Sequence, residues 1–237
     1  MTIGNLTWDT SGSRYYYTGI DAVILYPWAS TWYGNAVAWN GVTAINESPS
    51  GAESNKFYAD NIEYLNLLSK EEFGCTLECY QVPEGFDPCD GIVSVSMSYL
   101  ASTPKIKVRG QTRKPFGLFY RVLKGSDTVE AGGQVAAGKG KGYVYHFVYG
   151  CKASPSSRDF ATVNDSPEAQ TFSYEISTTP LTDNLPSGIT DIAHIEIDCS
   201  EIATNKFNAL NEHIFGNGSG GSNPIMPTPA QLVTWLA

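Results

Sequence analysis

Apolar and polar residues alternate in several short segments of this chain, and this repeat of two most limits the folds open to it. In the segment 73–79 every second residue is apolar or cysteine: Phe73, Cys75, Leu77 and Cys79. In the segment 171–177 the apolar positions are Phe172, Tyr174 and Ile176. A period of two places successive side chains on opposite faces of a β-strand. Further strand-like segments follow without the rhythm of β-α-β units, so we expect a mainly β fold, either a sandwich or a barrel.

Two short turns interrupt these segments. Asn40-Gly41 is a strong signal for a tight turn and predicts a hairpin there. The segment 56–72 is ambiguous, because helical spacing puts Phe57, Tyr64 and Leu68 on one side, interrupted by Asn61. A hairpin that turns at Asp60-Asn61 explains the segment better, since both residues tolerate the left-handed region of backbone space.

A credible helix appears near the end of the chain. Segment 204–216 offers Thr204 or Asn205 as a cap, apolar residues at spacings of three and four, and Gly216 as a stop. We expect one helix here that flanks the β-structure. The glycine-rich stretch that follows predicts a flexible linker, and the segment TPAQLVTWLA predicts a last short helix.

Composition narrows the classes of function. The 237 residues are 42% hydrophobic and carry a formal net charge of −9, which suits a globular protein that does not hold nucleic acid tightly. The first residues lack the basic start and apolar run of a signal peptide, and no segment is long enough to span a membrane, so we expect no membrane anchor. Five cysteines, an odd number, favour reduced thiols in a cytosol.

No motif nominates a catalytic, cofactor or metal site. The segment GKGKG at 138–142 lacks the spacing of a phosphate-binding loop and reads as a hairpin tip or flexible loop. His146, His194 and His213 are not at the spacing of metal ligands, and a zinc site would need a long-range convergence that no motif supports. His146 lies in an apolar strand-like segment and is expected in the core or an interface. We expect no cofactor, no metal and no enzyme activity.

Several longer blocks resemble one family. They are the segments AWNGVTAINESPSGAESNKFYADNIEYLNLLSKEEFGCTLECYQVPEGFDPCDG (38–91), 110–128 and 146–180, and the late segments KFNALNEHIFG and MPTPAQLV. In these segments the chain is similar to the major tail protein of long non-contractile-tailed phages and prophages of Gram-positive bacteria. The blocks cover nearly the whole chain. The resemblance implies a single tail tube domain over 1–237. Residues 1–18 are a candidate N-terminal arm, and 217–237 form a linker with a short C-terminal segment.

The same resemblance implies how such a chain works. Proteins of this kind form rings, usually hexamers, that stack into a tube through which DNA leaves the capsid during ejection. Their fold looks like a β-sandwich with a flanking helix and extended loops that reach neighbouring subunits. The implied partners are other copies of the chain, a tape-measure protein, and the tail terminator and distal tail proteins. The implied location is the tail of a virion that is assembled in the cytoplasm of the bacterial host.

Acidic residues on strand-like segments suggest how DNA would pass such a tube. Glu175 lies on a polar face with Thr171, Ser173 and Ser177 that carries no cation, and Glu78 lies on a similar face beside Thr76. An acidic wall repels DNA and prevents trapping. We therefore expect Glu78 or Glu175 to face the lumen, the alternative being an ordinary solvated surface.

Aromatic and basic residues suggest contacts between subunits. The aromatic candidates are Trp28, Trp32, Tyr33 and Trp39, with burial in the subunit's own core as the alternative. The basic candidates are Arg109, Arg113 and Lys114, which would meet acidic patches on a neighbouring ring or lie on a wet surface.

Two other functions remain open at the level of sequence. A carbohydrate-binding β-sandwich would use exposed tryptophan and tyrosine side chains to stack on sugars, and would show a row of exposed tryptophans. A hydrolase would need two convergent carboxylates, which no motif identifies.

Overall fold

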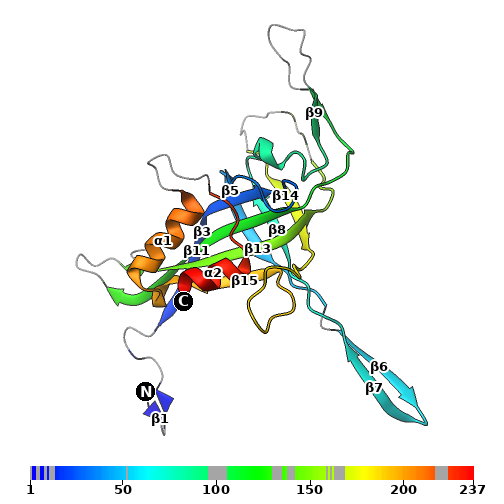
Figure 1. Ribbon diagram of the computed structural model, residues 1–237, viewed down its shortest axis with the longest axis vertical. Helices are drawn as coiled ribbons and strands as arrows, with labels where there is room; N and C mark the ends of the chain where they lie inside the picture. The colour runs from blue at the N-terminus through cyan, green and yellow to red at the C-terminus, as the bar shows by residue number, and fades with distance from the viewer. Residues whose placement is uncertain are drawn as a thin grey trace.

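The computed structural model describes residues 2–3, 6–7, 10, 14–51, 53–95, 106–129, 135–137, 142–158, 160, 162, 169–216 and 224–237. A nine-stranded antiparallel sheet forms its centre, and two helices cover one outer side of that sheet (Figure 1). The prediction of a mainly β fold is therefore confirmed. No helix in the described ranges is both long and apolar enough to cross a membrane.

The sheet is built from strands that lie far apart in the sequence. Its order is β4 (Val37–Ala38), β3 (Tyr15–Pro27), β11 (Phe116–Val129), β13 (Tyr143–Ala153), β14 (Phe172–Thr178), β8 (Gly74–Cys79) and β5 (Val42–Glu47). In addition, β12 (Val135–Ala137) pairs with β11, and β15 (His194–Asp198) pairs with β13. Three separate two-stranded pairs are β1 (Thr2–Ile3) with β2 (Leu6–Thr7), β6 (Ser54–Ala59) with β7 (Ile62–Leu68), and β9 (Val93–Val95) with β10 (Ile106–Val108).

The turn at Asn40-Gly41 joins the two ends of this sheet. Gly41 has φ +77°, as the turn signal predicts, but β4 pairs with β3 whereas β5 pairs with β8. The expected hairpin is therefore wrong, although the turn itself forms. The physical reason lies in Trp39, whose buried ring packs on Phe86 at 4.7 Å between ring centroids. By entering the interior there, the chain crosses from one half of the sheet to the other and brings the halves into a barrel-like sandwich.

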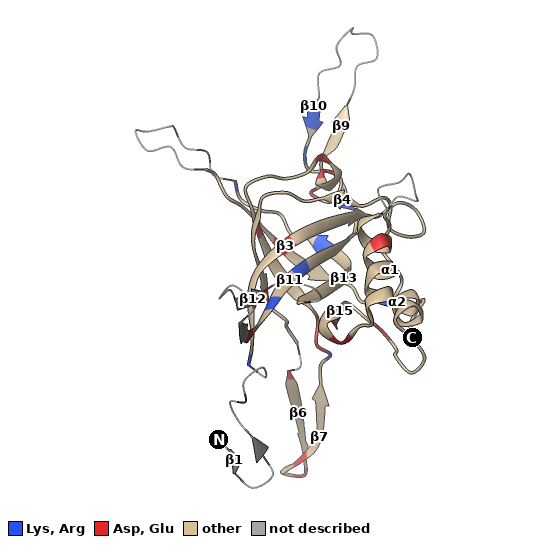
Figure 2. Ribbon diagram, turned by 90° about the vertical axis from the view of Figure 1, so that its left-hand side faces the viewer, with Lys and Arg blue, Asp and Glu red and all other residues tan. Residues whose placement is uncertain are grey.

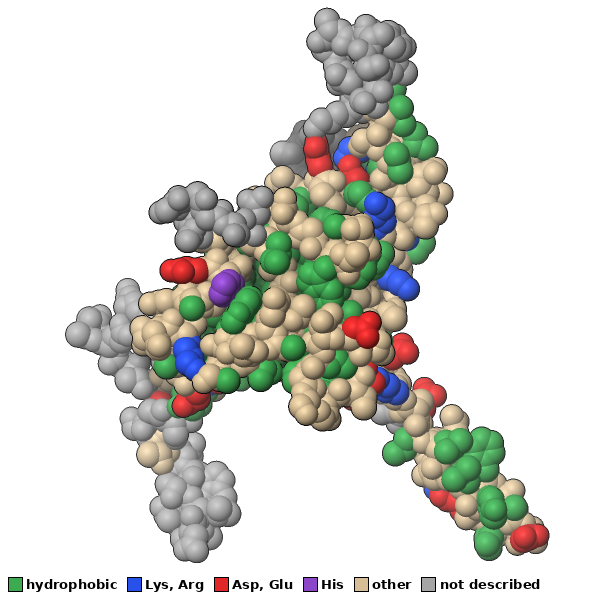
Figure 3. Space-filling view, in the orientation of Figure 1, with side chains coloured by type: hydrophobic (Ala, Val, Ile, Leu, Met, Phe, Trp, Pro, Cys, Tyr) green, Lys and Arg blue, Asp and Glu red, His purple; other side chains and the backbone are tan. Residues whose placement is uncertain are grey.

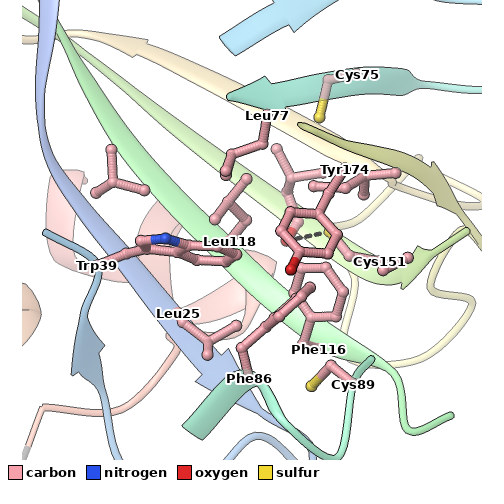
Figure 4. Close-up of a cluster of buried hydrophobic side chains, with 14 of the residues drawn as sticks. Leu25, Trp39, Cys75, Leu77, Phe86, Cys89, Phe116, Leu118, Cys151 and Tyr174 are labelled. Atoms are coloured by element: carbon pink, nitrogen blue, oxygen red, sulfur yellow. Dashed lines mark hydrogen bonds between the residues drawn. The ribbon is translucent and has the colours of Figure 1, made fainter. Parts of the chain in front are cut away.

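The first core fills the space between the two halves of the sheet (Figure 4). The inward faces of the strands supply its main side chains: Val23 and Leu25 from β3, Phe116 and Leu118 from β11, Cys75, Leu77 and Cys79 from β8, and Tyr174 and Ile176 from β14. The predicted inward face of residues 75–79 is thus confirmed. Full burial of one large apolar side chain contributes about 1.5–3 kcal/mol, so this layer is a main source of stability.

The second core lies between the outer face of β3, β11 and β13 and the helices α1 (Thr204–Phe215) and α2 (Pro229–Leu236). Phe207, Leu210 and Ile214 of α1 are buried here, as their spacing predicts. The helix ends at Gly216 with φ +82°, but its N-cap is Ala203 and no side chain caps it, so the expected cap at Thr204 or Asn205 is wrong. The predicted last helix forms as α2.

The hairpin β6–β7 extends away from both cores. Asp60 and Asn61 have φ +52° and +62°, so the hairpin over 54–68 is confirmed and the helical alternative is wrong. This hairpin and the β9–β10 pair project from opposite ends of the molecule (Figures 1 and 2). The predicted linker at 217–223 and all but the last residue of the GKGKG segment lie outside the described residues, as does much of the predicted arm at 1–18.

Candidate assembly surfaces

One face of the β6–β7 hairpin is mostly apolar. Phe57 pairs with Leu65, Asn55 with Leu67, and Ala59 with Ile62. The register shifts at Tyr64, where β7 has one extra residue, and on either side of this bulge paired residues share a face. One face therefore carries five apolar side chains: Phe57, Ala59, Ile62, Leu65 and Leu67. The opposite face is mixed: it carries Lys56 and Glu63, whose Nζ and Oε2 atoms are 2.8 Å apart, together with the exposed side chains of Tyr58 and Leu68.

The apolar face of this hairpin is open to solvent in the single chain. Phe57 is 51% exposed, Ile62 63%, Leu65 46% and Leu67 50%. Figure 3 shows hydrophobic side chains gathered on the projecting element. A lone two-stranded hairpin is at best marginally stable in water, and large exposed apolar patches mark sites of interaction. The geometry therefore suits an element that is covered by another protein.

Glu78 and Glu175 lie on the outward face of the other half of the sheet. In the β14–β8 pairing Glu175 is opposite Thr76, and Glu78 is opposite Ser173. Glu175 is exposed and Glu78 is partly buried. Sequence reasoning placed Glu175 on a face without cations, but Lys152 of β13 is exposed and pairs with Ser177 on that same face. The sequence missed this lysine because it belongs to a different strand.

Two of the three basic candidates converge on one buried carboxylate. Arg113 Nη1 lies 3.1 Å from Asp90 Oδ1, and Arg109 Nη1 lies 3.6 Å from Asp90 Oδ2. Arg158 joins them, with Nη2 at 3.0 Å from Asp90 Oδ2. Asp90 is only 8% exposed, so the arginines neutralise a buried charge within the subunit. Lys114 is exposed, and its backbone N–H donates a hydrogen bond to the carbonyl of Pro88.

The aromatic candidates divide into two groups. Trp39 and Tyr33 are 3% and 4% exposed, and both make internal hydrogen bonds: Trp39 Nε1 donates to the Gln81 carbonyl, and the Tyr33 hydroxyl accepts from the backbone N–H of Gly150. These two belong to the subunit's own cores. Trp28 and Trp32 are partly buried beside Tyr33, with Trp32 Nε1 donating to the Met226 carbonyl at 2.7 Å. Of the four aromatic candidates, only Trp28 and Trp32 have side chains partly exposed to solvent.

A cluster that sequence reasoning did not expect forms at one end of the inner core. His146 Nδ1 is 3.0 Å from His194 Nε2 and 3.5 Å from Glu47 Oε1. Burial lowers the pKa of His146, and burial together with His146 lowers the pKa of His194. The long-range convergence of two histidines that no motif supported is therefore present, produced by the pairing of β13 with β15.

Three pockets in the described surface have volumes of about 580, 420 and 440 Å³, and their lining residues show whether any could hold a pair of catalytic carboxylates. The largest contains Asp21, which pairs with Arg121 at 2.6 Å; the second is lined only by apolar residues; and the third contains Asp90 with its arginines. None of the three presents the paired carboxylates of a glycosidase. None of the four described tryptophans is exposed, so a row of sugar-stacking tryptophans is absent from the described chain.

No protein-family model matches the chain, and no curated protein matches it in sequence. Among solved structures, the chain is similar to the SPP1 tail tube determined by solid-state NMR and cryo-EM. The match has 10% sequence identity and a TM-score of 0.34, and it covers 85% of this chain and 87% of that chain.

Proposed function

We propose that this chain is a structural subunit of a phage tail tube of the long, non-contractile type. Copies of it assemble into hexameric rings that stack into a conduit for DNA. The observation that carries the proposal is the β6–β7 hairpin, whose apolar face is exposed in the single chain. The resemblance of blocks 38–91, 110–128 and 146–180 to tail tube proteins supports it independently of the structure.

Assembly through this hairpin follows from its geometry. The hairpin projects from one end of a compact body, so its apolar face reaches a surface on a second copy rather than its own sheet (Figure 1). Contacts between two different surfaces of identical subunits are head-to-tail, and they produce closed rings or open helical stacks. The exposed strands of the β9–β10 pair provide a second projection at the other end.

The acidic outer face of β14 and β8 is the proposed lining of the tube. Glu78 and Glu175 would repel the phosphates of passing DNA and keep it from binding. Trp28, Trp32 and Lys114 are proposed as secondary contacts between subunits. The tape-measure, tail terminator and distal tail proteins are the further proposed partners, with assembly in the bacterial cytoplasm and a final location in the virion tail.

Negative-stain electron microscopy of the purified chain tests this proposal. Rings or hollow tubes support it. A chain that stays monomeric and binds glycans would overturn it in favour of a carbohydrate-binding module. If the purified chain stays monomeric without binding glycans, addition of tail initiation proteins from the same virion must produce tubes, and their failure to do so contradicts the proposal.

A further inference from the structure

Two of the three histidines in this chain meet on the inward face of the sheet. His146 lies in β13, and His194 begins β15 opposite Val148, two residues further along β13. Residues at positions i and j±2 of paired strands are diagonal neighbours on the same face. This register brings the two ring nitrogens, His146 Nδ1 and His194 Nε2, to 3.0 Å.

A carboxylate from the opposite half of the sandwich joins this pair. Glu47 ends β5, where it is paired with Cys75 and so shares the inward face with that buried residue. Its Oε1 atom lies 3.5 Å from His146 Nδ1, and one ligand atom from each of the three residues lies within 4.8 Å of the others. Three separate strands thus supply two imidazoles and one carboxylate at a single point.

These distances fit a tetrahedral metal ion. Zinc binds histidine nitrogen at about 2.0–2.1 Å and carboxylate oxygen at about 2.0–2.2 Å, so ligand atoms around it lie about 3.3 Å apart. The separations of 3.0 and 3.5 Å bracket that value. We propose that Glu47, His146 and His194 form a binding site for a divalent transition metal of the zinc class, with a fourth position open to water.

The surroundings hold the three side chains in place. The His146 ring stacks on Tyr120 with 4.6 Å between centroids, and the His194 ring packs on Phe73 at 4.4 Å. The Tyr120 hydroxyl donates a hydrogen bond to Glu47 Oε1, the kind of outer contact that orients a carboxylate ligand. Glu47 remains 40% exposed, so an ion can enter from solvent.

Titration of the full-length chain with zinc chloride, after treatment with a chelator, tests the site by calorimetry. We expect one ion per chain, and substitution of cobalt should give the visible absorption of a tetrahedral centre. The variants His194→Gln and Glu47→Gln should weaken binding at least tenfold. His213→Gln is the matched control, because this third histidine lies on α1 against Trp235 and should leave binding unchanged.

Absence of stoichiometric binding to the wild-type chain would overturn the site and assign the 3.0 Å contact to a simple N–H···N hydrogen bond. Equal binding by the wild-type chain and Glu47→Gln would also overturn it. Because Glu47 is partly exposed, Glu47→Gln should fold, and it therefore still tests the site if His194→Gln does not fold. The proposal concerns the single chain, and its outcome does not depend on whether the chain forms tubes.

Discussion

Glu175 and Glu78 lie diagonally across the pairing of β14 with β8, on the outward face of the sheet. Glu175 is opposite Thr76, and Glu78 is opposite Ser173. The inward neighbours, Tyr174 and Leu77, are fully buried. The two acids therefore take no part in the core, and their charge is available for a role at the surface.

Reversing both charges should slow the passage of DNA without disturbing the fold. In the variant Glu78→Lys with Glu175→Lys, tubes should form normally because neither side chain packs in the core. DNA ejection from virions should slow, because lysines attract the phosphate backbone. The neutral variant Glu78→Gln with Glu175→Gln is the control and should show a smaller effect. Normal ejection kinetics from the lysine variant would exclude this face as the lining of the tube.

A charge on the apolar face of the β6–β7 hairpin should prevent assembly. Leu65→Asp puts a carboxylate beside Phe57, on the face that we propose a second copy covers. The monomer should keep its circular dichroism spectrum, since the hairpin is remote from both cores, whereas rings and tubes should be lost in electron micrographs. Asn66→Asp adds the same charge to the opposite face, next to Lys56, and should assemble as the wild type does. Tubes of Leu65→Asp in normal yield would rule out the hairpin as a contact.

Gly150 should tolerate no side chain. It has φ +62° where β13 changes partner from β15 to β14, and a Cβ atom there would lie 2.0 Å from the carbonyl oxygen of Thr179. Gly150→Ala should lower the free energy of unfolding by more than about 2 kcal/mol, measured by urea denaturation, because strain and a backbone clash add. Gly188→Ala separates the two effects, since Gly188 has φ +87° with open space around it. Equal losses in both variants would show that the clash contributes nothing.

The cysteines of the inner core should react slowly in the folded chain. Burial raises the pKa of the Cys75 and Cys89 thiols to about 12, and raises those of Cys79 and Cys151 as well. The reactive thiolate is therefore scarce, and all five cysteines are buried. Ellman's reagent at pH 8 should label the native chain very slowly and label five thiols per chain in denaturant. Rapid labelling of the native chain would contradict this packing.

The sequence alone determined which face the residues of β8 and β14 present. The inward positions of Cys75, Leu77 and Cys79 and the outward position of Glu175 follow from a period of two, which is a local property of extended backbone. The turn at Asp60-Asn61 was predictable for the same reason, because it depends on the backbone preferences of two adjacent residues.

Only the tertiary structure decided which strands pair and which distant side chains meet. The turn at Asn40-Gly41 was evident, yet β4 and β5 pair with different strands because the interior places Trp39 between them. His146 and His194 are 48 residues apart and are brought together by the register of β13 with β15. Arg109 and Arg113 are drawn to Asp90 by the cost of burying a charge. Such contacts depend on the packing of the whole sheet, and no local pattern in the sequence encodes them.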